Sequence, residues 1–330
     1  MSISDGTLLI VALAGLIATW AATGLVLMLL KRHAVLDRPN ERSSHATPTP
    51  RGAGLAVIVV FALGWATAAT LLDAPFEPII LAAAVGLAAV SWLDDLRGLP
   101  VGIRLLAHLA AVVAGLSTFP PEQMVFQGLL PPLADRIAAG LLWLWFVNLY
   151  NFMDGIDGIT GVETLAIAIG ASVCATLAAI APFPYAATVL IGAGAAGFLT
   201  WNWQPARIFL GDVGSVPLGF LTAWLLLLLA LHGAWIAAAI VPLYYLADAT
   251  LTLLKRMVRG EKIWRAHAGH YYQRAARRSG SHARVVGTIA VADALLIAAA
   301  GVAAAGHAAT ASLIFAAAVV GGLLWYFGRP

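Results

Sequence analysis

The chain has 330 residues, of which 61% are hydrophobic and only 11% are charged. Soluble globular domains have about 45–50% apolar and about 25% charged residues, so this composition excludes a soluble protein and indicates an integral membrane protein. The formal net charge of +3 does not indicate a nucleic-acid partner, because the basic residues follow the predicted membrane topology. The single cysteine, Cys174, excludes an intrachain disulfide and a Cys-x-x-Cys metal site.

Apolar stretches long enough to cross a bilayer recur along the whole chain and predict an all-α, polytopic fold with 10–11 transmembrane helices. The stretch 79–93 is short, and 184–201 could instead be partly re-entrant. The first stretch is too long for a cleavable signal peptide. We expect spans at 7–30, 53–72, 79–93, 101–117, 134–152, 161–180, 184–201, 215–231, 234–257, 284–302 and 309–327.

The basic residues predict the orientation of these spans. With the N-terminus outside, only Arg136 of the 19 lysine and arginine residues falls in an outside segment. Such a split follows the positive-inside rule, so we expect the C-terminus inside. No polar segment is long enough for a separate soluble domain. Residues 1–330 are therefore expected to form one transmembrane domain with inside loops at about 31–52, 94–100, 153–160, 202–214 and 258–283.

Polar residues cluster in these five inside loops. The most informative cluster follows an apolar span and combines two carboxamides and two carboxylates in Asn148-Leu-Tyr-Asn151-Phe-Met-Asp154-Gly155-Ile-Asp157-Gly158. Its first three polar residues share one face if the helix persists, and its glycines let the backbone approach a ligand closely. The other clusters include Arg51-Gly-Ala-Gly54, Asp94-Asp95-Leu-Arg97 followed by Arg104, Gly211-Asp212-Val-Gly214-Ser215, and His267-Ala-Gly-His270-Tyr-Tyr-Gln-Arg274.

Each cluster also has a purely structural interpretation. The Asp-Asp pair could be ordinary helix-end carboxylates, the Gly-Asp-x-Gly-Ser run could cap a helix, and the basic stretch 255–278 could anchor the protein on anionic lipid. Their coincidence favours chemistry. Carboxylates gathered at one membrane face repel one another unless a cation compensates them, which favours a Mg²⁺ site with arginine and histidine nearby for phosphate oxygens. The five aspartates predicted at that face are Asp94, Asp95, Asp154, Asp157 and Asp212.

The five clusters, in this order and at these span ends, resemble those of the polyprenyl-phosphate N-acetylhexosamine-1-phosphate transferases. This superfamily includes the phospho-MurNAc-pentapeptide transferase of peptidoglycan synthesis and the enzymes that initiate O-antigen synthesis. The resemblance runs from about Asp37 to Arg278. It implies a bacterial inner-membrane enzyme with a cytoplasmic active site. Such an enzyme moves a HexNAc-1-phosphate from a UDP-activated amino sugar to undecaprenyl phosphate and releases UMP.

The resemblance also implies roles for individual residues. Asn151 and Asp212 would hold Mg²⁺, or Mn²⁺ in its place. Asp157 and Gly158 would lie near the uridine. The acidic pair would bind metal or activate the acceptor phosphate, and the base stays open between Asp94 and Asp95. Substrate contacts or catalytic roles are further implied for Asp154, whose part is unassigned, for Arg51, Arg104 and Asn202, and for a basic loop with Arg265, His267, His270 and Arg274.

Three departures from the family pattern bear on the substrate. Ala53 interrupts a run of three glycines, and no third acidic residue follows the Asp-Asp pair. The fifth cluster has His-x-x-His in place of three adjacent histidines of the peptidoglycan enzyme. This favours UDP-GlcNAc or a related deoxy sugar, for O-antigen or another envelope glycan, and leaves UDP-MurNAc-pentapeptide as the alternative. The sequence leaves open which sugar is used and whether the protein forms a homodimer.

Two other classes of protein fit this sequence less well than an enzyme. An ion-coupled transporter would hold its carboxylates near the membrane midplane, whereas these are predicted at one face. A structural membrane subunit would leave all five polar clusters unexplained. Both classes are therefore disfavoured.

Overall fold

The computed structural model describes residues 4–33, 35–37, 47–261 and 267–329. Within these residues the chain forms thirteen helices and one short antiparallel ladder, so the predicted all-α class is confirmed. The helices are α1 (Asp5–Arg32), α2 (Gly54–Leu72), α3 (Pro78–Arg97), α4 (Val101–Leu116), α5 (Pro132–Met153), α6 (Ile159–Leu177), α7 (Tyr185–Asn202), α8 (Asp212–Leu231), α9 (Trp235–Ile240), α10 (Leu243–Val258), α11 (Tyr271–Ser279), α12 (His282–Ala304) and α13 (Ala309–Gly328). The ladder pairs β1 (Leu36–Asp37) with β2 (Thr49–Pro50).

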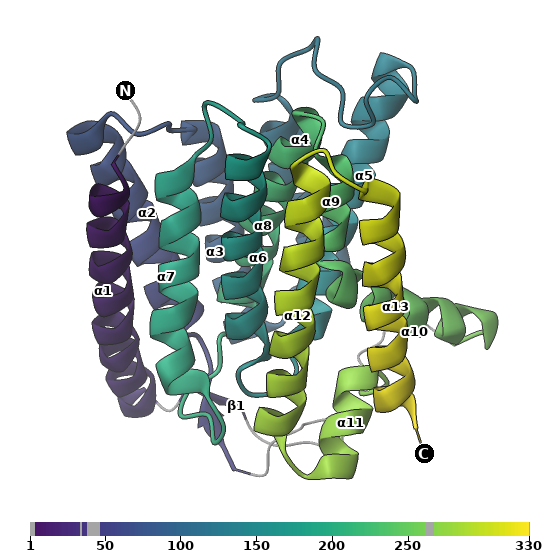
Figure 1. Ribbon diagram of the computed structural model, residues 1–330. Coiled ribbons are helices and arrows are strands. Elements are labelled where there is room, and N and C mark those ends of the chain that lie inside the picture. The colour runs from purple at the N-terminus through teal and green to yellow at the C-terminus, as the bar shows by residue number, and fades with distance from the viewer. Residues whose placement is uncertain (1–3, 34, 38–46, 262–266, 330) are drawn as a thin grey trace.

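The long helices stand side by side as a bundle, with the two chain termini at opposite ends (Figure 1). Ten of the eleven predicted spans correspond to one helix each. The stretch 79–93 is part of the longer α3, and 184–201 forms the continuous helix α7. Seven helices of the described chain are long and apolar enough to cross a membrane: α1, α2, α3, α6, α8, α12 and α13.

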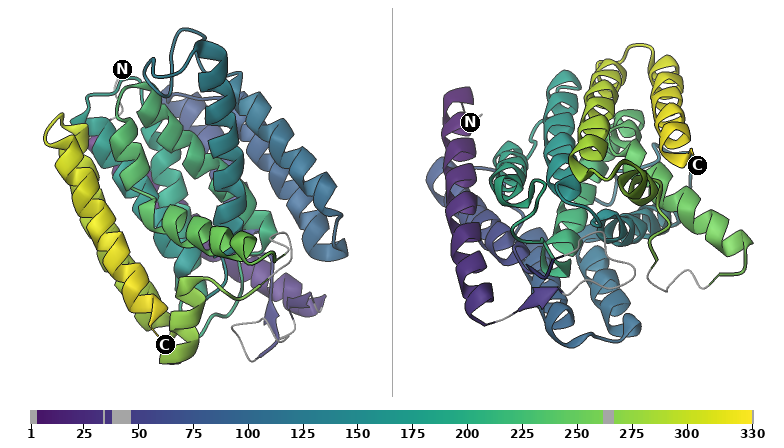
Figure 2. Two further views of the ribbon diagram at one scale, coloured as in Figure 1. Left: turned by 90° about the vertical axis from the view of Figure 1, so that its right-hand side faces the viewer. Right: turned by 90° about the horizontal axis from the view of Figure 1, so that it is seen from below.

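The single span predicted over 234–257 is wrong. Helix α9 ends at Ile240 after six residues, and a second helix, α10, begins at Leu243. Pro242 lies between them; a proline has no N–H to continue a helical ladder, and its ring clashes with the preceding turn. Helix α10 then turns out of the bundle and runs across its side near the lower end (Figures 1 and 2). Its 16 residues would be only about 24 Å long, too short to span a bilayer.

Helix α8 forms the centre of the bundle. Almost all of its side chains are buried, and it packs against α2, α3, α5, α6 and α9. A helix that is apolar on all sides has no polar face to turn toward water, which suits this central position. Small residues let neighbouring backbones approach: a methyl group at Gly197 of α7 would lie 2.6 Å from the carbonyl oxygen of Leu16 in α1.

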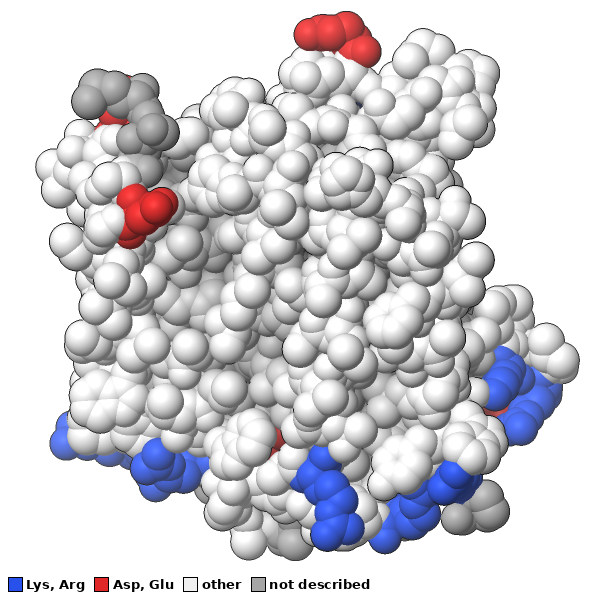
Figure 3. Space-filling view, in the orientation of Figure 1, with Lys and Arg blue, Asp and Glu red and all other residues white. Residues whose placement is uncertain are grey.

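Charged residues divide between the two ends of the bundle. Lysine and arginine gather at the end that carries the C-terminus, and the surface between the ends is free of charge on the face shown in Figure 3. This distribution is the one from which the topology was predicted. Which end faces the cytoplasm stays a prediction.

Candidate active site

Backbone hydrogen bonds join the first and fourth polar clusters. The amide of Phe209 donates to the carbonyl of Pro50 (2.8 Å), and the amide of Gly52 donates back to that of Phe209 (3.0 Å). Two residues further on, a methyl group at Gly54 would lie 2.2 Å from the amide nitrogen of Gly214. The glycines of both motifs are therefore required by this backbone contact, which brings Arg51 beside the start of α8.

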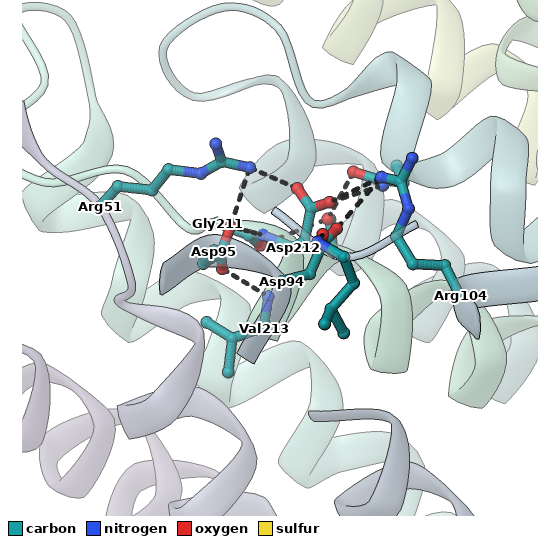
Figure 4. Close-up of polar contacts among 10 residues, drawn as sticks. Arg51, Asp94, Asp95, Arg104, Gly211, Asp212 and Val213 are labelled. Atoms are coloured by element: carbon teal, nitrogen blue, oxygen red, sulfur yellow. Dashed lines mark hydrogen bonds and ion pairs between the residues drawn. The ribbon is translucent and has the colours of Figure 1, made fainter. Parts of the chain in front are cut away.

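Asp95 caps the N-terminus of α8. Its two carboxylate oxygens accept hydrogen bonds from the amides of Asp212 (3.2 Å) and Val213 (3.0 Å), where the helix dipole favours a negative charge. Arg51 forms an ion pair with the same carboxylate at 2.9 Å. With a side chain only 3% exposed, Asp95 has its oxygens occupied by protein donors and holds the site together (Figure 4).

Asp94, the preceding residue of α3, points away from α8 and toward the start of α4. It accepts hydrogen bonds from the amide of Leu99 (2.6 Å) and from Arg104 (3.1 Å). Arg104 also lies 4.0 Å from Asp212, and Arg51 forms an ion pair with Asp212 from the opposite side (Figure 4). The two members of the predicted acidic pair therefore differ: Asp94 faces the cavity that adjoins Arg104, and Asp95 faces the protein.

Three carboxylates and two guanidiniums meet at this point, so the cluster of Arg51, Asp94, Asp95, Arg104 and Asp212 has a formal charge of −1. Burial lowers the pKa of Arg51, but the carboxylates of Asp212 and Asp95 more than offset this effect and keep it fully charged. The excess negative charge can be balanced by a cation, and the arginines can bind phosphate oxygens.

Asn151 completes the cluster from the end of α5. Its amide nitrogen lies 3.3 Å from a carboxylate oxygen of Asp212, and its amide oxygen accepts from the Ser215 hydroxyl (3.0 Å). A half-turn of the amide exchanges nitrogen and oxygen, because the serine hydroxyl can also accept a hydrogen bond. Asn151 and Asp212 can thus present two hard oxygen ligands side by side. Across the described residues, no three Asp, Glu, His or Cys side chains form a cage for a metal. Mg²⁺ keeps several waters and substrate oxygens, so two protein ligands fit it.

Asp154 ends α5 and lies behind this cluster. Its carboxylate accepts a hydrogen bond from the Thr160 hydroxyl (2.6 Å). Burial raises the pKa of Asp154 to about 6, although the Thr160 hydrogen bond and Arg51 oppose that shift. A carboxyl with such a pKa is partly protonated near neutral pH.

An apolar groove leads away from the cluster. It has a volume of about 440 Å³, and its polar end is formed by Asp94, Arg104, Asn151 and Asp212. The remaining walls come from five helices and are lined by Ser91, Val101, Leu105, His108, Leu141, Leu144, Trp145, Asn148, Phe152, Val216 and Leu253. This groove joins a charged end to a hydrocarbon-like wall.

A second, polar pocket of about 350 Å³ lies next to Asp157. The Asp157 carboxylate accepts from the amide of Ala206 (3.0 Å) and lies 3.4 Å from the His282 ring at the start of α12. The pocket is also lined by Thr47, Thr49, Gln204, Pro205, Phe209, Ala276, Arg277 and Gly280. Gln204, Arg277 and His282 were not singled out from the sequence.

Asn202 and Gly158 brace this pocket from behind. The amide oxygen of Asn202 accepts from the amide of Gly158 (2.8 Å), and its nitrogen donates to the carbonyl of Ile208 (3.0 Å). Asn202 is only 5% exposed. Both of its polar atoms are thus engaged within the protein, which places it as a connection between two site loops.

The fifth cluster is divided by the structure. His267 is partly exposed, whereas His270 is 2% exposed and its ring is held by Asp248. Arg274 donates to the carbonyl of Gly328 at the end of α13, away from the acidic cluster. Arg265 lies outside the described residues. Asp248 was missed from the sequence, although an acidic residue inside a predicted apolar span was a signal that could have found it.

Comparison with known proteins agrees with this site. Residues 78–230 match the family model described as glycosyl transferase family 4. The matched segment includes Asp94, Asp95, Asn151 and Asp212, so most of the acidic cluster lies in the part of the chain that is similar to this family.

Several relatives have been named for their activities. A Bacillus subtilis protein named "probable undecaprenyl-phosphate N-acetylglucosaminyl 1-phosphate transferase" is 26% identical over 74% of this chain and 72% of its own length. The decaprenyl-phosphate N-acetylglucosaminephosphotransferase of Mycobacterium tuberculosis is 27% identical over 84% and 78%. The phospho-N-acetylmuramoyl-pentapeptide-transferase of Deinococcus radiodurans is 28% identical over 68% and 75%.

Proposed function

We propose that the protein transfers a HexNAc-1-phosphate from a UDP-activated amino sugar to undecaprenyl phosphate and releases UMP, with its active site on the cytoplasmic side. One observation carries this proposal: the Asp–Arg cluster lies where the apolar groove ends. Such a site suits an acceptor with a phosphate head and a hydrocarbon tail. The relatives' names, which combine a polyprenyl phosphate with an amino-sugar phosphate, support the same reaction.

The groove is proposed to bind the acceptor. Arg104 would bind the acceptor phosphate at the polar end, with Asp94 fixing the guanidinium by the hydrogen bond of 3.1 Å. The second pKa of a phosphate monoester is about 6, so most of the acceptor is already a dianion at neutral pH. Positioning therefore contributes more than a strong base, and Asp94 rather than Asp95 adjoins the acceptor.

The polar pocket is proposed to bind the nucleoside of the donor, beside Asp157 and Phe209. Arg51 would then contact the diphosphate. An oxygen of the acceptor phosphate attacks the phosphorus that carries the sugar, and the bond from this phosphorus to the UMP oxygen breaks. UMP leaves with the electron pair, so no proton has to move. When bound between Asn151 and Asp212, Mg²⁺ would neutralise the diphosphate charge and favour departure of UMP.

UMP release tests this proposal directly. The purified protein is incubated with Mg²⁺, undecaprenyl phosphate and, in separate reactions, UDP-GlcNAc, UDP-FucNAc or UDP-MurNAc-pentapeptide. We expect UMP release with UDP-GlcNAc or UDP-FucNAc. The lipid-linked sugar would then start the synthesis of O-antigen or of another envelope glycan. Release with the pentapeptide donor alone would favour the alternative substrate of the Deinococcus radiodurans relative. No UMP with any donor would refute the transferase.

The metal role has its own test. Asp212→Asn should abolish turnover while the protein stays folded in detergent, because one of the two hard oxygen ligands loses its charge. A matched control is Asp135→Asn, since Asp135 is a buried carboxylate at the far end of α5 that accepts from the amides of Val125 (2.9 Å) and Phe126 (2.8 Å). Turnover near that of the wild type in Asp212→Asn would refute the role.

A further inference from the structure

Asp248 of α10 is a buried carboxylate that the proposed reaction does not use. It is 0% exposed, and each of its oxygens accepts a backbone hydrogen bond. One oxygen accepts from the amide of Tyr271 (3.0 Å) and the other from the amide of Tyr272 (3.0 Å). These are the first two amides of α11, which no carbonyl of that helix can satisfy. Asp248 therefore caps α11 from a different element of the chain.

Side chains add three more donors to the same carboxylate. The hydroxyls of Tyr244 (3.0 Å) and Thr252 (3.2 Å) donate to it from α10 itself. The third donor is Nδ1 of His270, at 3.2 Å. Because a carboxylate only accepts, this contact places a proton on Nδ1 of the His270 ring. Five donors thus fix the carboxylate, the His270 ring and the start of α11.

The start of α11 rests on the turn that follows Asn151. The Tyr272 hydroxyl donates to the carbonyl of Phe152 (3.1 Å). At Gly155 the fit is so close that an added methyl group would lie 2.2 Å from the same hydroxyl. Hence the position of α11, which Asp248 fixes, decides where the Asn151–Gly155 turn can lie.

His267 is held by the same arrangement. Its ring stacks on that of His270 with centroids 4.8 Å apart and an interplanar angle of 22°. Nδ1 of His267 accepts from the amide of Gly269 (3.2 Å), so a neutral ring carries its proton on Nε2. Burial, with the charges of His270 and Arg256, lowers the pKa of His267 to about 4. At neutral pH the ring is therefore an uncharged hydrogen-bond donor.

From these contacts we propose that Asp248 is a positioning residue of the transferase site. It orients His270 and, through that ring, His267. It also fixes the start of α11, on which the Asn151–Gly155 turn rests, so that the His267 Nε2–H can donate to a phosphate oxygen of the donor substrate. His270 supports the site without contacting the substrate. This inference rests on the proposed function and assigns His267 and His270 different parts in it.

The test compares Asp248→Asn with Asp135→Asn in the transferase assay. The asparagine side chain has the same size, but only one of its two terminal atoms can accept hydrogen bonds. One of the two amides at the start of α11 therefore loses its acceptor. Changes in such supporting groups cost about 10–100-fold in activity, and we expect a fall of this size in kcat per folded molecule for Asp248→Asn, with little change in the KM for undecaprenyl phosphate. Asp135→Asn also removes a buried carboxylate that accepts two backbone hydrogen bonds, but should keep the wild-type kcat. Equal kcat values for both variants and the wild type would overturn the inference.

A second readout does not depend on transferase activity. Diethyl pyrocarbonate acylates accessible, unprotonated imidazole nitrogens, and peptide mass spectrometry locates the product. In the wild type we expect His270 to be protected and His267 to react; in Asp248→Asn, His270 should also react. Acylation of His270 at the same rate in both proteins would refute the positioning role even if no donor sugar supports UMP release.

If Asp248→Asn does not fold, Tyr272→Phe replaces it in the kinetic assay. Loss of the hydrogen bond from the Tyr272 hydroxyl to Phe152 should lower kcat about fivefold, and an unchanged kcat would contradict the inference.

Discussion

Gly155→Ala is the most informative single substitution at this site. The new methyl group would lie 2.2 Å from the Tyr272 hydroxyl and 2.9 Å from the side-chain nitrogen of Gln273. Ordinary contacts between such atoms are about 3.5 Å or longer. Helix α11 or the turn must therefore move by about 1 Å, and the hydrogen bond of 3.1 Å from Tyr272 to Phe152 is lost.

The expected cost follows from these two effects. Overpacking of a well-packed interior costs about 1–3 kcal/mol, and a lost hydrogen bond costs about 1 kcal/mol. We expect Gly155→Ala to lower the free energy of unfolding by about 2–4 kcal/mol in total. Because a displacement of 1 Å can cost about 100-fold in rate, kcat should fall by up to about two orders of magnitude.

The assay measures thermal unfolding in detergent and UMP release for Gly155→Ala and two reference variants. In Gly155→Ala with Tyr272→Phe the atom nearest to the new methyl group is gone, so much of the loss should be recovered relative to Gly155→Ala alone. At Gly86 an added methyl group meets no atom within 4 Å, and Gly86→Ala should be neutral or stabilising by about 0.5–1 kcal/mol. If Gly155→Ala matched Gly86→Ala in stability and in kcat, the close contact with α11 would not exist.

Further predictions concern pH, the bundle interior and topology. The unfolded His267 ring, with a pKa of about 6.5, takes up a proton before the folded ring with a pKa of about 4, so stability falls as the pH is lowered through this range. Thermal unfolding of His267→Gln should show a weaker pH dependence between those values, and an identical profile would contradict the lowered pKa. Glu163 of α6 and Asp293 of α12 are buried, neighbouring carboxyl groups whose oxygens have no hydrogen-bond partner. Replacing one of them by an apolar side chain, in Asp293→Leu, should therefore raise the melting temperature by about 2 °C or more, and a lower melting temperature would show that the carboxyl group has a stabilising partner. The one native cysteine is buried. A membrane-impermeant maleimide should thus label Glu122→Cys but not Arg259→Cys on intact cells, and the reverse pattern would invert the proposed topology.

The length and position of the apolar stretches predicted ten of the helices, because each of these helices corresponds to one continuous apolar stretch. The span at 234–257 was mispredicted for a specific reason: the stretch is apolar throughout, and only Pro242 marks the break between α9 and α10. A proline can kink a membrane helix or end it, and the outcome depends on the neighbouring helices. Local sequence does not contain that information.

The candidate site shows a similar limit. Sequence order placed Asp94 and Asp95 together at a helix end, but only the packing of α3 against α8 shows that one faces the cavity and the other caps a helix. His267 and His270 likewise differ because of Asp248, which is distant in sequence from the motif that it supports. The sequence motifs thus predicted which segments form the site. The role of each residue within it depends on tertiary contacts that the motifs do not contain.

The departure of α10 from the bundle has a consequence for how the enzyme meets its acceptor. Leu253 of α10 lines the apolar groove, whose other walls belong to the upright helices. On the proposed function, a polyprenyl lipid can then slide in from the side while its tail stays in the bilayer. The relevant supply is a two-dimensional pool, measured as mole fraction in the membrane and not as bulk concentration. Turnover in micelles should accordingly follow the ratio of lipid to detergent, and two preparations with the same total acceptor can differ in rate through surface dilution alone.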